Sequence, residues 1–215
     1  MELLNRRREM GSHLPYDAEV EYIQTDGKAY IDTGVKTSSN LTFDLNLYIP
    51  SLETNGVWMF GSRISGSSGQ MAYLNDHSYN IKQWRYHNNE VISSPKLPPG
   101  NYNFKNTASA SVLKINDTIT LFVSFATFTS DYNFYLLTLN VGGIPAIGNI
   151  GNGARIMPSK IYLSGVLVRD YIAVRKDGVG YLYDKVSGEL FGNANSEGAF
   201  SYGTDKVARG GGISA

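Results

Sequence analysis

The chain of 215 residues contains no cysteine, so disulfide bonds, thiolate nucleophiles and Cys-ligated zinc are excluded together. It has no surplus of either charge, because 19 Lys and Arg balance 19 Asp and Glu. No overall field would draw it to nucleic acid or to an anionic membrane, and we expect neither as a partner. It also lacks the apolar run of a transmembrane helix and the apolar stretch of a secretory signal. We therefore expect a soluble protein without a visible export route.

The residues that are abundant favour strands and tight turns. Fifteen Tyr, nine Phe and 23 Gly stand against only seven Pro. Aromatic side chains suit a half-buried pleated surface, and glycine supplies the positive φ that tight turns require. The 42% apolar content is enough for one substantial core in a chain of this length. The composition therefore predicts a single all-β domain.

Short apolar or alternating segments recur along the chain, and two-residue turn signals separate them. We expect hairpins at six of these signals: Asp26-Gly27, Asn88-Asn89, Asn116-Asp117, Ser164-Gly165, Asp177-Gly178 and Ser187-Gly188. So many reversals imply antiparallel sheets that close into a sandwich to hide their edges. Six residues are expected in its core: Tyr22, Ile31, Phe43, Trp84, Leu121 and Tyr183.

The chain divides into an N-terminal arm (residues 1–15), a domain (16–203) and a Gly-rich C-terminal tail (204–215). The arm is expected to form a short helix over residues 2–10. Its apolar and basic side chains would dock against a partner in an assembly: Leu3, Leu4, Arg6, Arg7 and Arg8. Three arginines in a neutral protein make a small patch, so docking is favoured over nucleic-acid binding. Gly11-Ser12-His13 resembles an expression-vector scar, but the residues before it are no usual tag, which favours a native arm.

Three segments resemble a known family. VEYIQTDGKAYIDTG (20–34) is similar to the opening of concanavalin A-like (LamG-like) jelly rolls, which are common in bacteriophages, prophages and gut bacteria. LVRDYIAVR (167–175) and GVGYLYDKVSGELFGNA (178–194) resemble the closing hairpins of that family. The resemblance implies a two-sheet antiparallel jelly-roll sandwich. It implies no activity, because such folds include lectins, glycanases and structural proteins.

Catalytic motifs are weak, and we expect no enzyme. The E-x-D-x-x-E strand motif of jelly-roll glycanases does not occur, and Glu19 and Glu21 are interpreted as a solvated strand edge. The three histidines, His13, His77 and His87, accompany no G-x-S-x-G sequence. The Gly-rich stretch 148–153 leads into Ala154-Arg155 without a Lys-Ser/Thr pair, so it is interpreted as a loop.

No cofactor is expected, and Ca²⁺ is the metal that the composition would suit best. Oxygen ligands for it would come from Asn75-Asp76, Asn116-Asp117 and Asp131. These residues are also ordinary turn formers, and this second interpretation is favoured. We therefore expect no metal ligands.

The segment 81–87 carries the candidate glycan-binding residues. Alternation along a strand puts Trp84 and Tyr86 on one face, where core burial is the favoured interpretation. Gln83, Arg85 and His87 then form the opposite, polar face that a glycan could meet. Trp58 lies in an apolar run typical of a strand buried on both faces, and Arg169-Asp170 is interpreted as a structural ion pair.

Two classes of function remain. The first is a non-enzymatic phage structural protein of the virion (head decoration, head fibre or tail component), anchored through its arm to other virion proteins and to copies of itself, with host-surface glycan as a further partner. The second is a bacterial carbohydrate-binding or adhesin module at the cell surface or outside the cell. A glycanase is a distant third.

Overall fold

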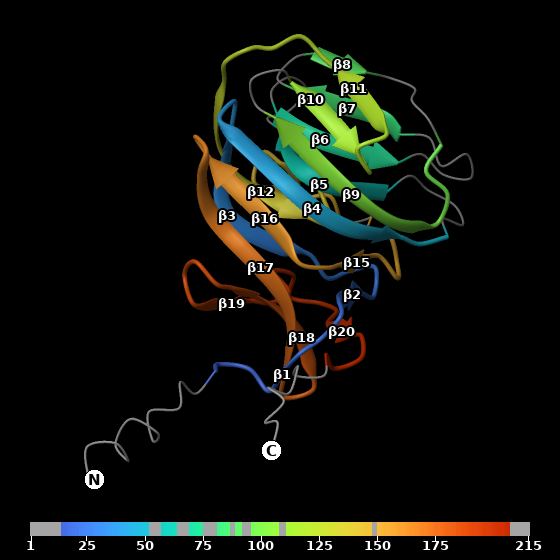
Figure 1. Ribbon diagram of the computed structural model, residues 1–215, viewed down its shortest axis with the longest axis vertical. Helices are drawn as coiled ribbons and strands as arrows, with labels where there is room; N and C mark the ends of the chain where they lie inside the picture. The colour runs from blue at the N-terminus through green and yellow to red at the C-terminus, as the bar shows by residue number, and fades with distance from the viewer. Residues whose placement is uncertain are drawn as a thin grey trace, which may run out of the picture.

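The computed structural model describes residues 14–51, 57–63, 69–74, 81–86, 89–91, 96–107, 111–147 and 150–206, with only the backbone of 69–74, 81–86, 89–91 and 107. These residues form two packed β-sheets without an α-helix, which confirms the predicted all-β, jelly-roll-like sandwich (Figure 1). The predicted arm helix, with Leu3, Leu4 and Arg6 to Arg8, lies outside the described residues, as do His87 and the tail from 207 onward. No helix in the described ranges is long and apolar enough to cross a membrane.

The first sheet has 12 strands, eight of which form a continuous path. In spatial order the path is β11 (Ile119–Phe122), β10 (Val112–Ile115), β9 (Gly100–Thr107), β4 (Leu41–Ile49), β16 (Ser159–Leu163), β17 (Val166–Lys176), β18 (Val179–Asp184) and β19 (Glu189–Phe191). Four short strands extend it beside β4 and β17: β1 (Ala18–Glu19), β2 (Ile23–Thr25), β15 (Arg155–Ile156) and β20 (Phe200–Tyr202). Segments from both ends of the chain thus meet in one sheet.

The second sheet has eight strands and lies behind the first in Figure 1. Its path is β14 (Ile144–Pro145), β13 (Asn140–Val141), β5 (Val57–Arg63), β6 (Gly69–Leu74), β7 (Ile81–Tyr86) and β8 (Asn89–Val91). The strand β12 (Thr129–Leu136) pairs with both β5 and β3 (Ile31–Ser38). Among the described pairs only β13 and β5 run parallel, so the sandwich is predominantly antiparallel.

The core lies between the sheets and is built on alternation. In β4 every second residue from Leu41 to Ile49 is buried, and the residues between them are only half-buried. The ring of Phe43 in the first sheet contacts Phe60 and Phe134 in the second, at centroid distances of 4.9 and 5.5 Å. Each such buried side chain stabilises the fold by about 2 kcal/mol, so these facing rings hold the two sheets together.

Five of the six expected hairpins are confirmed. Strand pairs β7–β8, β10–β11, β16–β17, β17–β18 and β18–β19 are antiparallel neighbours. The reversal between β7 and β8 comes one residue earlier than predicted, because Asn89 already belongs to β8 and pairs with Tyr86. At Ser164-Gly165 and Asp177-Gly178 both turn residues have positive φ, as a two-residue turn that matches strand twist requires.

The sixth expected hairpin, at Asp26-Gly27, is wrong. The chain does turn there, with φ of 88° at Gly27, but β2 pairs with β15 and β20 whereas β3 pairs with β12 in the other sheet. The Asp26 carboxylate accepts hydrogen bonds from the backbone N–H groups of Lys28, Ala29 and Ala199. This carboxylate ties the crossing between sheets to a distant loop, which turn chemistry alone does not predict.

Three of the six expected core residues are confirmed. Ile31, Phe43 and Leu121 are buried. Tyr22 and Tyr183 are only half-buried, because they lie on the outer side of the first sheet, and the side chain of Trp84 lies outside the description. Val57 to Ser62 are buried apart from Trp58, which is half-buried and stacks under Arg63.

The predicted ion pair between Arg169 and Asp170 is wrong, because neighbours along a strand point to opposite faces. Arg169 lies 3.6 Å from the buried carboxylate of Asp184. Asp170 instead lies 3.3 Å from Lys185. Both residues are structural, as expected, but each has a different partner.

Candidate functional site

One row of side chains crosses five strands on the outer face of the first sheet. Backbone register aligns Asn101 of β9 with Tyr48 of β4, Tyr48 with Arg155 of β15, Arg155 with Gln24 of β2, and Gln24 with Ser201 of β20. Paired residues point to the same face of a sheet. Because the adjacent positions Leu47, Ile156 and Ile23 are buried in the core, this row faces outward. We call these five residues the Arg155 row.

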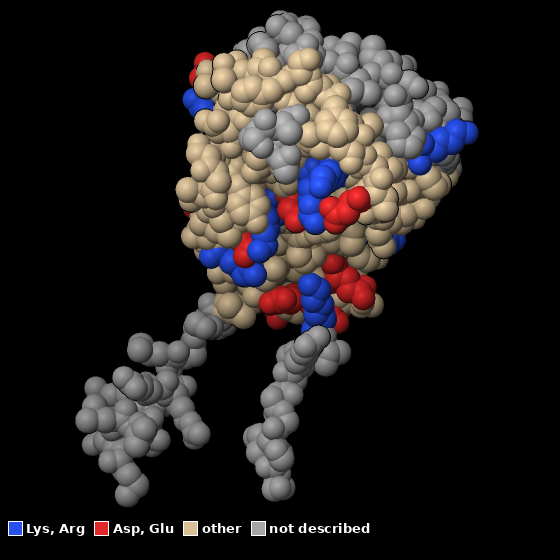
Figure 2. Space-filling model, turned by 45° about the horizontal axis from the view of Figure 1, so that its top comes forward, with Lys and Arg blue, Asp and Glu red and all other residues tan. Residues whose placement is uncertain are grey.

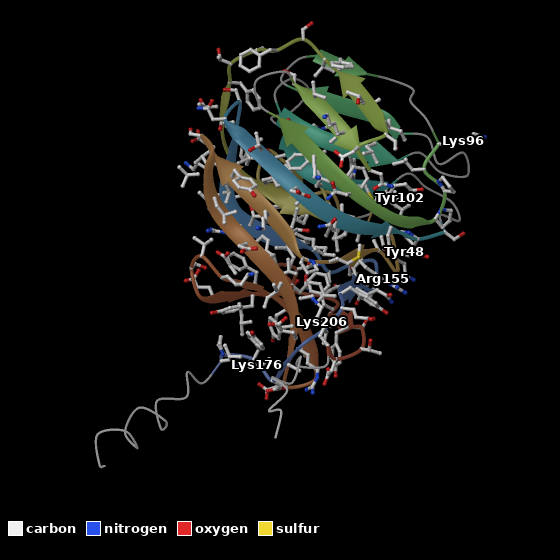
Figure 3. The ribbon with its side chains drawn as sticks, in the orientation of Figure 1. Tyr48, Lys96, Tyr102, Arg155, Lys176 and Lys206 are labelled. Carbon is white, nitrogen blue, oxygen red and sulfur yellow. The ribbon has the colours of Figure 1, made fainter. Side chains whose placement is uncertain are left out.

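Arg155 is held at the centre of the row by aromatic rings. Its guanidinium carbon lies 4.1 Å from the ring centroid of Tyr22 and 4.6 Å from that of Tyr48. Its Nε donates a hydrogen bond of 2.8 Å to Oε1 of Gln24. Figure 3 shows Tyr48 and Arg155 next to one another, beside β4 and β15, whereas Lys176 lies lower in the view, toward β1. Two rings and one amide thus fix the orientation of this cation.

The ring of Tyr22 is itself held in place by the backbone of Gly203. A Cβ atom at Gly203 would come within 2.7 Å of the Tyr22 ring, so a larger residue there would displace it. The N–H of Gly203 donates to the carbonyl of Tyr22 at 3.0 Å. The surface around Arg155 is therefore preformed by close packing of residues from both ends of the chain.

Asparagines extend this polar surface along β4 and β9. Asn103 and Asn46 are directly paired, and Nδ2 of Asn103 donates to the Asn46 side chain at 2.9 Å and also to Asp44. Further along, Lys105 lies 3.9 Å from Asp44 and 3.5 Å from Asp117. Charges of opposite sign thus lie next to one another on this part of the sheet, and Figure 2 shows charged groups of both signs gathered on the face it presents.

A second candidate is a hollow of about 540 Å³ between three loops. Its walls are Gly27, Lys28, Ile147, Ile150, Asn195, Ser196 and Glu197. Lys28 and Glu197 neutralise each other at 3.0 Å, and the Asn195 amide donates to the carbonyl of Lys28. These polar groups already bind one another and no aromatic ring is present among the described walls, so the Arg155 row is the stronger candidate.

A buried tyrosine pair lies on the second sheet. The rings of Tyr30 and Tyr135 pack against each other in a tilted arrangement, with their centroids 5.0 Å apart, and both residues are nearly inaccessible. Burial, followed by the charge of Asp32, raises the pKa of Tyr135 to about 12. Burial likewise raises the pKa of Tyr30. Both hydroxyls therefore stay protonated at neutral pH and are suited to structural hydrogen bonds rather than to proton abstraction.

The residues predicted from the sequence lie elsewhere. Gln83 and Arg85 belong to β7 of the second sheet, where the description covers only the backbone. They therefore do not share a sheet with the Arg155 row. The sequence assigned no role to Arg155, which follows the Gly-rich stretch interpreted as a loop; the structure places it in β15, where it pairs with Tyr48 and Gln24.

The loop residues weighed as Ca²⁺ ligands make other contacts. Asn116 accepts the backbone N–H of Asn103 at 2.7 Å, Asp117 pairs with Lys105, and Asp131 pairs with Lys36 at 3.3 Å. Asn75-Asp76 lies outside the described residues. Within the described ranges, no three His, Cys, Asp or Glu side chains are grouped as metal ligands.

The sandwich is similar to one solved structure in particular. It superposes on a "putative carbohydrate binding protein" from Bacteroides ovatus with a TM-score of 0.56 and 10% sequence identity. The match covers 88% of this chain and 62% of that chain, so this chain spans less than two thirds of its length. At this identity the likeness shows the fold alone. No family model and no curated protein matches the chain.

Proposed function

We propose that the chain is a carbohydrate-binding module of the concanavalin A-like kind and that it binds glycan across the Arg155 row. The observation that carries the proposal is the row itself, which presents rings and planar amides side by side on a preformed sheet face. Tyrosine combines an apolar ring with a polar hydroxyl, and amide groups can donate to and accept from sugar hydroxyls. The similar fold of the Bacteroides ovatus protein, whose name refers to carbohydrate, adds support.

The shape of the surface favours an extended glycan over a single sugar. Asn101 and Ser201, at the two ends of the row, are exposed, and Tyr48 and Gln24 between them are half-buried. Oε1 of Gln24 accepts from Arg155, so its amide nitrogen remains as a donor toward a ligand. A glycan lying across the strands would contact several of these groups at once, which compensates for the modest energy of each hydrogen bond.

Binding is proposed to occur without catalysis. The test is calorimetric titration of an oligosaccharide panel against the wild type and against Tyr48→Ala. Loss of the ring should weaken binding about tenfold, because an aromatic contact contributes about 1 kcal/mol or more. Phe122→Ala is the matched control: this ring is 68% exposed at the other edge of the same sheet, on β11.

An equal loss of affinity in both variants, or an absence of binding to the whole panel, would contradict the proposal. New reducing ends in the incubated glycan would contradict the proposal that binding occurs without catalysis.

The role as a phage virion protein and the location in a virion stay predictions, since the arm residues on which they depend lie outside the described ranges.

A further inference from the structure

We infer that Arg155 binds a carboxylate group, so that the glycan recognised by the row is an acidic one containing uronic acid. This inference rests on the proposed function and names its substrate class. Two tyrosine rings lie against the guanidinium and its Nε is bonded to Gln24, whereas among the described residues its two terminal nitrogens have no hydrogen-bond partner.

The geometry leaves one mode of anion binding open. A guanidinium can meet a carboxylate side-on, through Nε and one terminal nitrogen, or end-on, through both terminal nitrogens. The hydrogen bond from Nε to Gln24 Oε1 at 2.8 Å occupies the side-on position. The end-on fork stays available, and it matches the spacing of the two oxygens of a planar carboxylate.

The electrostatics of the row point to the same ligand. Arg155 is the one charged member of the row, and no carboxylate of the described residues lies within ion-pair distance of it. The other two arginines described in this sheet, Arg169 and Arg175, each lie beside an aspartate. An arginine fixed in orientation but lacking a counter-charge gains most from a ligand that brings one.

The test uses an oligogalacturonide and the same oligosaccharide with its carboxyl groups methyl-esterified, both titrated calorimetrically into the full chain. The wild type should bind the acid form about tenfold more tightly than the ester, and added salt should reduce this preference. Arg155→Met should bind both forms with the affinity of the ester. Arg155→Lys keeps the charge but lacks the fork, and should show an intermediate preference.

Lys114→Met is the matched control, because it removes one positive charge from the outer face of the same sheet, on the far side of β9. It should retain the full preference for the acid form. Thermal unfolding of each variant establishes that it is folded. If Arg155→Met does not fold, Arg155→Lys still tests the inference.

The outcomes separate the two proposals. Binding of both forms with equal affinity by the wild type would overturn this inference and leave the carbohydrate-binding function standing. A preference that persists in Arg155→Met would overturn it as well. Binding of neither form, together with failure of the neutral panel, would overturn both proposals. If a sulfated oligosaccharide binds more tightly than the oligogalacturonide, the carboxylate assignment is overturned, and sulfate is the group that Arg155 recognises.

Discussion

On β17 both arginines are bound by carboxylates, whereas Arg155 on β15 is bound by two tyrosine rings and an amide. Arg175 makes two hydrogen bonds of 2.8 Å to Asp205 and lies 3.5 Å from Asp17. Arg169 donates to the carbonyls of Thr33 and Val168 and lies beside Asp184. The charges of both β17 arginines are thus neutralised by carboxylates of this chain, and each arginine links β17 to other segments of the fold.

The difference teaches how a structural arginine can be told from one available to a ligand. Exposure does not separate them, since Arg155, Arg169 and Arg175 are all half-buried. The separating feature is whether a carboxylate occupies the terminal nitrogens.

The largest effect is expected at Asp184, whose carboxylate is fully buried beside Arg169. It accepts hydrogen bonds from the backbone N–H groups of Asp170, Val186 and Ser187. Asp184→Ala removes all of these acceptors and leaves a cation without its partner, so the free energy of unfolding should fall by about 3 kcal/mol. Urea unfolding followed by tryptophan fluorescence measures it.

Asp131→Ala is the control for that experiment, since the Asp131 side chain is 94% exposed in its pair with Lys36. Its free energy of unfolding should stay within about 0.5 kcal/mol of the wild type. Similar losses in Asp184→Ala and Asp131→Ala would show that burial of the carboxylate is not what stabilises β17.

A smaller effect on stability is expected at Arg155. Arg155→Met keeps an apolar side chain between the two tyrosine rings and loses one hydrogen bond and the cation–π contacts. The free energy of unfolding should fall by about 1 kcal/mol in the same urea titration. A loss as large as that of Asp184→Ala would mean that Arg155 is structural, and would remove the contrast with β17.

The smallest effect is the contribution of the β17 region to the acid dependence of stability. The hydrogen bond from Arg175 lowers the pKa of Asp205 below its ordinary value of 3.8. A carboxyl group with a lowered folded-state pKa contributes stability above the ordinary value, and this contribution is lost as the pH falls through the folded-state value. Asp205→Asn should therefore flatten the fall of unfolding free energy between about pH 4 and pH 2.

Arg155→Met should leave that acid slope unchanged, because no carboxylate of the described residues is paired with Arg155. Urea titrations at a series of pH values compare the slopes of the two variants with the wild type. The slope of Asp205→Asn will not vanish. Although burial alone raises the pKa of Asp26, its hydrogen bonds from Ala199, Lys28 and Ala29 outweigh this and lower it, so Asp26 also loses stabilisation in acid.

Much of the sandwich could be predicted because several strands carry their own signal. The alternation from Leu41 to Ile49 specifies which face of β4 is buried, and Asp177-Gly178 specifies the turn that joins β17 to β18. The outward direction of Asn46 and Tyr48 follows from the same alternation. These features depend on neighbours in sequence, which a single chain reveals.

The Arg155 row could not be predicted because it depends on alignment between distant short strands. β15 has two residues and β2 and β20 have three each, too few to show a period. Arg155 follows a Gly-rich stretch, so its local sequence is typical of a loop. Only the pairing of β15 with both β4 and β2 brings its side chain between Tyr22 and Tyr48.

The distance along the chain between Gln24 and Ser201 has a consequence for synthesis on the ribosome. The Ser201 hydroxyl donates to the carbonyl of Gln24 across a separation of 177 residues. β2 therefore lacks its neighbour β20 until residues 200–202 have emerged, and pairings of such long range form slowly. A nascent chain would leave Tyr22 without its support from Gly203 until that residue has emerged, so the surface around Arg155 is completed late in synthesis.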